Sequence, residues 1–188
     1  MTYSNGNIYS GDWINDVFHG KGTYLKPNGQ SISGDWENGY LIRGQIIFFK
    51  DVMGEEKYIG EVVYGFFGYP IPHGMGAYFC LNGDKYVGEF VDYKKEGKGT
   101  FTWANGDSYC GYWHDDEFHG KGTRTWPNGT TYTGDFVKDS ITGSGKLLEF
   151  DDDGNFKSEF VGEFLDGDLH GKGTSKWYDG QIYTGEYR

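Results

Sequence analysis

The sequence has few of the features that mark disulfide-stabilised, membrane-spanning or compact α/β proteins. Its 188 residues include only two cysteines and four prolines, too few cysteines for a disulfide framework. No apolar run approaches the roughly 18 residues of a membrane-spanning helix. The first residues, MTYSNGNIYS, contain neither a basic region nor an apolar stretch, so no signal peptide is predicted. These absences favour the cytosol or another reducing compartment.

Positive charge is also scarce. Seventeen Lys and Arg stand against 28 Asp and Glu, which gives a formal net charge of −11. Nucleic-acid binding requires clustered Lys and Arg against the phosphates, so a nucleic-acid partner is not expected. The same excess of acid weakens attraction to anionic lipid without excluding it.

Glycine and aromatic residues are abundant. The chain contains 33 Gly together with 16 Tyr, 14 Phe and 6 Trp. Long helices avoid glycine, which costs roughly 1 kcal/mol relative to alanine. We therefore predict an all-β fold in which aromatic rings supply most of the buried apolar area.

Two phrases recur along the chain. FHGKGT occurs at 18–23 and 118–123, and LHGKGT at 169–174. A second phrase, aromatic-x-Gly-(Asp/Glu)-(Trp/Phe), recurs with variations at spacings of 23, 26, 28, 23, 23, 28 and 23 residues. A base period of 23 with short insertions is typical of a repeat architecture. The second phrase begins at Tyr9, Ile32, Tyr58, Tyr86, Tyr109, Tyr132, Phe160 and Tyr183.

Each repeat is predicted to be one β-hairpin. Side chains alternate along a strand, so Tyr9, Gly11 and Trp13 share one face. Placing Gly11 opposite Gly22 sets the expected pairs Tyr9–Tyr24, Trp13–Gly20 and Asp12–Lys21. The PNG segments at 27–29 and 127–129 fit three-residue turns with glycine in the left-handed position. The acidic run at 149–155 is interpreted as an enlarged, solvated turn, because it lacks the glycine and glutamate spacing of an EF-hand.

The two phrases at this period resemble the MORN (membrane occupation and recognition nexus) repeat. The resemblance covers the chain from Ile8 to Tyr187 and implies an elongated, twisted, single-layer ribbon of about seven tandem hairpins. It further implies one MORN domain over residues 1–188, with a partial repeat from Tyr183, and a scaffold or targeting role. The second and third repeats are the most degenerate, since Ile32 and Val62 replace aromatic residues and LIRGQ lacks His-Gly.

No catalytic, metal or cofactor site is predicted. FHGKGT lacks the G-x-x-x-x-G-K-(S/T) spacing of a phosphate loop. His19, His73, His119 and His170 share one repeat position in alternate repeats, roughly 19 Å apart at about 4.8 Å per strand, which no single metal ion can span. The carboxylates of the second phrase are equally regular rather than convergent. An enzyme is therefore not expected.

One insertion interrupts the repeats. The apolar segment FFGYPIP at 66–72 either folds back over the weak second and third repeats or forms an exposed docking loop. Both interpretations stay open at this point.

Two hypotheses of function remain. The first is a protein-interaction scaffold that binds a partner helix or extended peptide in an aromatic groove. Its predicted binding residues are Phe101, Trp103, Trp113 and Trp126, with Phe66, Phe67 and Tyr69 in the insertion. The second is a membrane-targeting module that binds phosphoinositide or anionic lipid, or the MORN portion of a larger protein. Homodimerisation through terminal edge strands is a further expectation. The expected location is the cytoplasm, free or attached to the cytoskeleton or a membrane.

Overall fold

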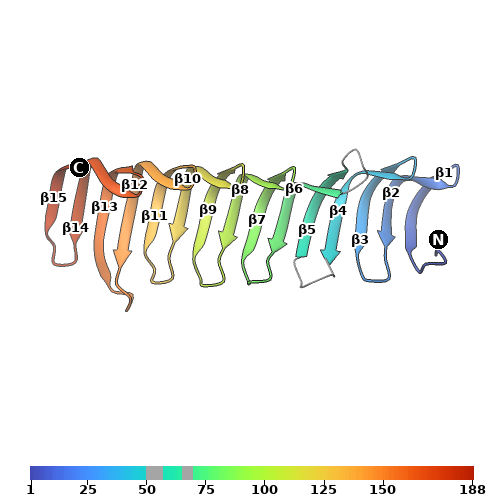
Figure 1. Ribbon diagram of the computed structural model, residues 1–188, viewed down its shortest axis with the longest axis horizontal. Coiled ribbons are helices and arrows are strands. Elements are labelled where there is room, and N and C mark those ends of the chain that lie inside the picture. Colours follow the sequence, from blue (N-terminus) through green and yellow to red (C-terminus); the bar gives the residue numbers. More distant parts are fainter. Residues whose placement is uncertain (50–56, 65–69) are drawn as a thin grey trace. The chain divides into compact units, whose positions relative to one another are not determined.

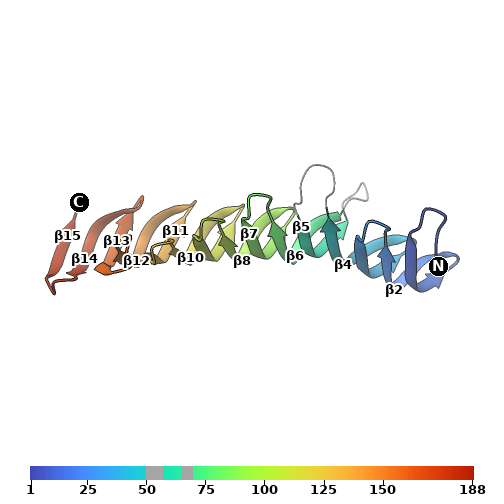
Figure 2. The same ribbon diagram turned by 90° about the horizontal axis from the view of Figure 1, so that it is seen from below.

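The computed structural model describes residues 1–49, 57–64 and 70–188. These residues form strands and turns. No helix occurs among the described residues, and so none that could cross a membrane. The chain divides into two compact units, Met1–Lys94 and Lys95–Arg188. Each unit is a single layer of antiparallel strands in which strands adjacent in sequence pair with each other (Figures 1 and 2). The predicted all-β, single-layer arrangement of tandem hairpins is confirmed.

The strands are short and regular. The first unit contains β1 (Ile8–Ile14), β2 (Val17–Leu25), β3 (Ser31–Glu37), β4 (Tyr40–Phe49), β5 (Lys57–Tyr64), β6 (Pro70–Phe79) and β7 (Lys85–Val91). Then follow β8 (Lys94–Thr102), β9 (Ser108–His114), β10 (Glu117–Thr125), β11 (Thr131–Val137), β12 (Ser140–Phe150), β13 (Phe156–Leu165), β14 (Asp168–Trp177) and β15 (Ile182–Tyr187).

A line of paired glycines crosses the strands. Gly11 lies opposite Gly22 and Tyr9 opposite Tyr24, as predicted. In the second unit the line continues without a break from β8 to β15 through glycines 99, 111, 122, 134, 145, 162, 173 and 185. In the first unit it breaks between β4 and β5, where Gly44 faces Val62 instead of a glycine. This break lies in the degenerate second and third repeats.

Tyrosine rings cover the glycine line on one face. The Tyr109 side chain lies over Gly111 and Gly122, so that a Cβ atom added at either glycine would lie 2.5 Å from the tyrosine oxygen. The Tyr109 hydroxyl donates a hydrogen bond to the Tyr112 carbonyl at 2.8 Å. Tyr109 is fully buried, as are Tyr9 and Tyr132. Burial raises the pKa of Tyr109 above its ordinary value, and that of Tyr132 to about 12. The repeat therefore needs glycine because the ring occupies the space of a side chain.

The second half of the predicted hairpin register is wrong. A bulge follows Gly11, so Asp12 faces His19 and Trp13 faces Phe18 rather than Lys21 and Gly20. Gly20 adopts φ 58°, and the Lys21 N–H donates to the Asp12 carboxylate at 3.1 Å. A bulge inserts extra residues into one strand and bends it. The opposite charges of Asp12 and Lys21 suggested a direct pairing and gave no sign of the bulge.

The bulge also changes which carboxylate each lysine faces. Lys21 pairs in register with Asp35 of the following hairpin. Lys121 does the same with Asp135, and its ammonium lies 2.7 Å from that carboxylate. Lys98 faces Tyr112 instead, with the ammonium 5.4 Å from the ring centroid. The predicted pairing within one hairpin is thus replaced by pairing between hairpins.

The turns between hairpins that the structure describes are three residues long. The Lys26 N–H donates to the Gln30 carbonyl and the Gly29 N–H to the Lys26 carbonyl, both at 2.9 Å, and Gly29 has φ 83°. The three-residue prediction for the PNG segments is confirmed. The acidic run has the same turn geometry, closed by the Asp151 N–H to the Asn155 carbonyl at 3.0 Å. It is not enlarged, because the extra residues lengthen β12 and β13 to 11 and 10 residues.

The interrupting segment contributes to a strand. Pro70 to Pro72, predicted to be loop residues, begin β6 and pair with β5, with Val62 opposite Pro72. The remainder of the predicted insertion, including Phe66, Phe67 and Tyr69, lies outside the described residues.

Candidate partner-binding site

Three of the predicted binding residues line one hollow. Phe101, Trp103 and Trp113 surround a cavity of about 330 Å³ in the second unit. Phe118 completes the aromatic wall, and the charged residues that line the same hollow are Lys95, Asp116 and Asp139.

The strand register brings the rings together. Phe101 on β8 faces Tyr109 on β9, and Trp113 at the other end of β9 faces Phe118 on β10. Trp103 follows β8 in a three-residue turn, where its backbone N–H donates to the Asp107 carbonyl at 3.0 Å. The ring centroids of Phe101 and Trp103 are 4.7 Å apart, and the Trp103 ring meets the Phe118 ring edge-on at 6.0 Å.

The four rings differ in exposure. Trp113 and Phe118 are 4% and 7% exposed, and the Trp113 indole N–H donates to the Gly99 carbonyl at 3.1 Å. The Trp36 indole makes the same bond to Gly22 in the first unit, so this tryptophan role is structural. Phe101 and Trp103 are half-buried. They therefore supply the contact surface, while Trp113 and Phe118 form its support.

The hollow is lined by a lysine at a repeat position where two other repeats carry phenylalanine. Phe18 and Phe118 stack on Tyr9 and Tyr109 with centroids 3.9 Å apart. Lys95 occupies the same repeat position, 23 residues before Phe118. A lysine fills less of this layer than a phenylalanine ring, and sequence analysis missed it. Comparing the residues at this one repeat position identifies it.

Lys95 is held by an acid and by the rings. Its ammonium lies 2.8 Å from the Asp116 carboxylate, 5.2 Å from the Trp113 ring centroid and 6.0 Å from that of Phe101. The Asp116 carboxylate also accepts the Lys95 backbone N–H at 2.9 Å. The side of the hollow toward β9 thus already contains a cation against aromatic faces.

Trp126, the fourth predicted residue, lies apart from the other three. It lines a separate hollow of about 440 Å³ with Pro127, Asn128, Thr130 and Asp152. The Arg124 guanidinium lies between the two tryptophans, with its carbon 5.2 Å from the Trp103 ring and 5.0 Å from the Trp126 ring. Its terminal nitrogen is 3.7 Å from the Asp107 carboxylate. Sequence analysis missed Arg124, which stands where Tyr24 and Phe101 stand in other repeats.

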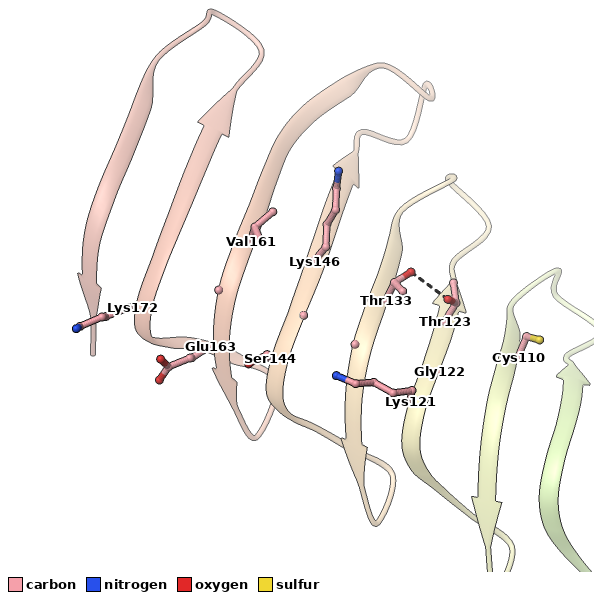
Figure 3. A pocket seen from close by; sticks show the side chains of 13 residues that line it. Cys110, Lys121, Gly122, Thr123, Thr133, Ser144, Lys146, Val161, Glu163 and Lys172 are labelled. Atoms are coloured by element: carbon pink, nitrogen blue, oxygen red, sulfur yellow. Dashed lines mark hydrogen bonds between the residues drawn. The ribbon is translucent and has the colours of Figure 1, made fainter.

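The opposite face is polar. A hollow of about 740 Å³ on this face follows the glycine line in the second unit (Figure 3). The lining side chains include hydroxyls, such as the hydrogen-bonded pair Thr123 and Thr133 at 3.0 Å, and lysines. Lys121 is paired with Asp135 at 2.7 Å and Lys146 with Glu159 at 2.8 Å. Lys121 and Lys146 thus already have carboxylate counter-ions, and the third lysine of the hollow, Lys172, shares it with the Glu163 carboxylate.

The histidine, cysteine and carboxylate side chains of the described residues are dispersed rather than gathered around one point. The described residues contain no group of three or more that could hold a metal ion. The His114 and His119 rings are neighbours, with centroids 5.8 Å apart, but His114 is hydrogen-bonded to Glu96 at 3.0 Å. Its role is an ion pair on the surface of β9.

Comparison with known proteins identifies four of these hairpins as copies of one known repeat. The MORN repeat model matches residues 9–31, 86–108, 109–131 and 160–182. The chain carries MORN repeats. MORN repeats are generally non-enzymatic modules that often take part in interactions with proteins or lipids. The repeats that begin near Ile32, Tyr58 and Tyr132 lie outside the four matches. In the structure each of them is again a pair of antiparallel strands, β3–β4, β5–β6 and β11–β12.

Two known proteins resemble the chain over different lengths. MORN repeat-containing protein 3 of Xenopus laevis is 34% identical over 79 residues, which are 40% of this chain and 31% of that protein. The match thus spans less than a third of the relative's length. The solved TCP domain of SAS-4 from Drosophila melanogaster, in complex with a proline-rich motif of Ana2, aligns over 100% of this chain and 88% of that one, at 9% identity and a TM-score of 0.45. So distant a likeness carries no argument about function.

Proposed function

We propose that this chain is a non-enzymatic protein-interaction module that binds a helix or extended peptide of a partner protein on its aromatic face. The observation that carries the proposal is the hollow bounded by Phe101, Trp103, Trp113 and Phe118. Interface energy concentrates in a few Trp and Tyr anchors and the pockets beside them. A hollow with two half-buried rings over two buried ones suits an apolar or aliphatic side chain of a partner.

Lipid binding has less support. A phosphoinositide headgroup needs several unpaired cations, each worth about 1 kcal/mol near an anionic surface. The lysines of the polar hollow at positions 121 and 146 are instead paired with carboxylates. The net charge of −11 opposes the approach of an anionic membrane.

The test compares two tryptophans at the same repeat position. Trp103 lines the hollow. Trp177 occupies the corresponding position of a later repeat, is 37% exposed and does not line this hollow. Trp103→Ala and Trp177→Ala are each used to capture partners from a cell lysate, with thermal unfolding measured for both. We expect the first variant alone to lose partners while still unfolding cooperatively. A folded Trp103→Ala protein that recovers every partner undiminished would exclude this hollow as the binding site.

A further inference from the structure

We propose that the partner segment is basic and that it places a Lys or Arg side chain in the hollow beside Asp139. This inference rests on the proposed function and specifies the chemistry of the partner. The aliphatic stem of the incoming side chain contacts the half-buried Trp103 ring, and its charged end reaches the Asp139 carboxylate.

The first argument is that these rings already bind cations of the chain itself. The Lys95 ammonium lies over Trp113, and the Arg124 guanidinium lies between Trp103 and Trp126. Ring faces attract cations by roughly 0.5–2 kcal/mol, depending on exposure. Walls that bind ammonium and guanidinium groups from within the chain suit the same groups from a partner.

The second argument is the state of Asp139. One of its carboxylate oxygens accepts the Phe118 N–H at 2.7 Å, which fixes the side chain at the hollow. Its neighbour Asp116 has Lys95 as a counter-ion. In the part of the chain that the structure describes, no Lys, Arg or His lies within 4.0 Å of the Asp139 carboxylate. Asp139 is therefore the acid of the hollow whose charge is left for a partner.

The third argument is the charge around the hollow. Residues 95–188 contain ten Lys and Arg against seventeen Asp and Glu, a net charge of −7. The hairpin ends of β9–β10, β11–β12 and β13–β14 carry six of these acids and one lysine, Lys138, and are therefore strongly acidic. The acids are Asp115, Asp116, Glu117, Asp139, Asp166 and Asp168. A surface of one sign steers oppositely charged partners and repels like-charged ones. An acidic segment, or a second copy of this chain, meets repulsion here.

The experiment uses three synthetic helical peptides of equal length and equal leucine pattern. Their polar positions carry Lys, Gln or Glu respectively, and binding to the full chain is measured by fluorescence anisotropy at low and high salt. We expect the Lys peptide to bind tightest and the Glu peptide weakest, with the difference shrinking as salt rises.

Two matched variants locate the contact. Asp139→Asn removes the charge and keeps an oxygen for the Phe118 N–H, whereas Asp166→Asn removes the same charge at the corresponding end of the next hairpin. We expect Asp139→Asn to weaken binding of the Lys peptide about five-fold and Asp166→Asn to weaken it less than about two-fold, as for one partly exposed ion pair. The Gln peptide should be unaffected by either.

The outcomes separate this inference from the proposed function. Equal binding of the three peptides, still weakened by Trp103→Ala, overturns the basic partner and leaves the proposed function in place. Equal losses of Lys-peptide binding in Asp139→Asn and Asp166→Asn would mean that the acids of the hairpin ends attract the peptide together. That result overturns the assignment to this hollow. Binding that Trp103→Ala does not change overturns both.

Discussion

The Tyr109 ring lies nearly parallel to the Phe118 ring, with centroids 3.9 Å apart and an angle of 19° between the planes. Tyr109 covers the glycine pair beneath it, so the stack places two aromatic layers over the line of glycines. A single-layer sheet has no second sheet to cover its apolar face, and this stack takes that place. The same arrangement occurs between Tyr9 and Phe18.

Removing the outer ring of this stack should destabilise the second unit. Phe118 is 7% exposed and contacts Tyr109, Trp113 and Phe136, so we expect Phe118→Ala to cost roughly 3–5 kcal/mol of unfolding free energy in urea titration. Phe118→Leu should cost less than half of that, because Leu169 occupies the same repeat position. A loss under about 1 kcal/mol for the alanine variant would contradict a structural role for the stack.

The paired glycines should be far less tolerant than those of the turns. A Cβ at Gly122 meets the Tyr109 oxygen at 2.5 Å, whereas one at Gly154, with φ 80°, meets no atom within 4 Å. We expect Gly154→Ala to cost about 1–2 kcal/mol for the left-handed backbone alone, and Gly122→Ala to cost about 3 kcal/mol or more from overpacking. Urea unfolding of the two variants measures the difference. Equal losses would show that the Tyr109 ring can move aside.

Filling the hollow should separate binding from stability. Lys95→Phe supplies the ring that Phe18 and Phe118 carry at this repeat position. We therefore expect unfolding free energy to be retained or increased and binding of the Lys peptide to fall at least about ten-fold. Lys95→Met is the control, since it removes the ammonium but keeps the side-chain length and the hollow. That variant should still bind, because it also frees the Asp116 carboxylate. Undiminished binding by Lys95→Phe would argue against the hollow.

The Glu96–His114 pair should make the stability of the contact between β8 and β9 depend on pH. The hydrogen bond between them raises the pKa of His114 and lowers that of Glu96. The stabilisation by a raised histidine is complete below its unfolded pKa and is lost as pH rises through the folded value. The stabilisation by a lowered glutamate is present above its unfolded pKa and is lost as pH falls through the folded value.

The pair therefore acts between the two pKa values, in mildly acidic solution. We expect an NMR titration of the His114 ring to give a pKa above its ordinary value of about 6.5. In Glu96→Gln the pKa should fall toward that value. A His114 titration that is the same in both proteins would show that the ion pair does not form in solution.

Much of the fold follows from the sequence alone. The 23-residue period, the pairing of Gly11 with Gly22 and the three-residue PNG turns depend on local rules: strand alternation, the space a glycine leaves, and the left-handed backbone at Gly29. Such rules act over a few residues, so a pattern repeated along the chain reveals them. Phe101, Trp103 and Trp113 could be placed on one face for the same reason.

Only the tertiary structure decided what those faces do. The bulge after Gly11 moved Lys21 from Asp12 to the acid of the next hairpin, and it brought Phe18 onto Tyr9. Trp126 shares a repeat position with Trp103, yet the Arg124 guanidinium between their rings separates their hollows. The hollow beside Lys95 arises because this repeat carries a lysine where the next repeat carries Phe118. A site of this kind depends on the volume that neighbouring strands fail to fill, which no single stretch of sequence records.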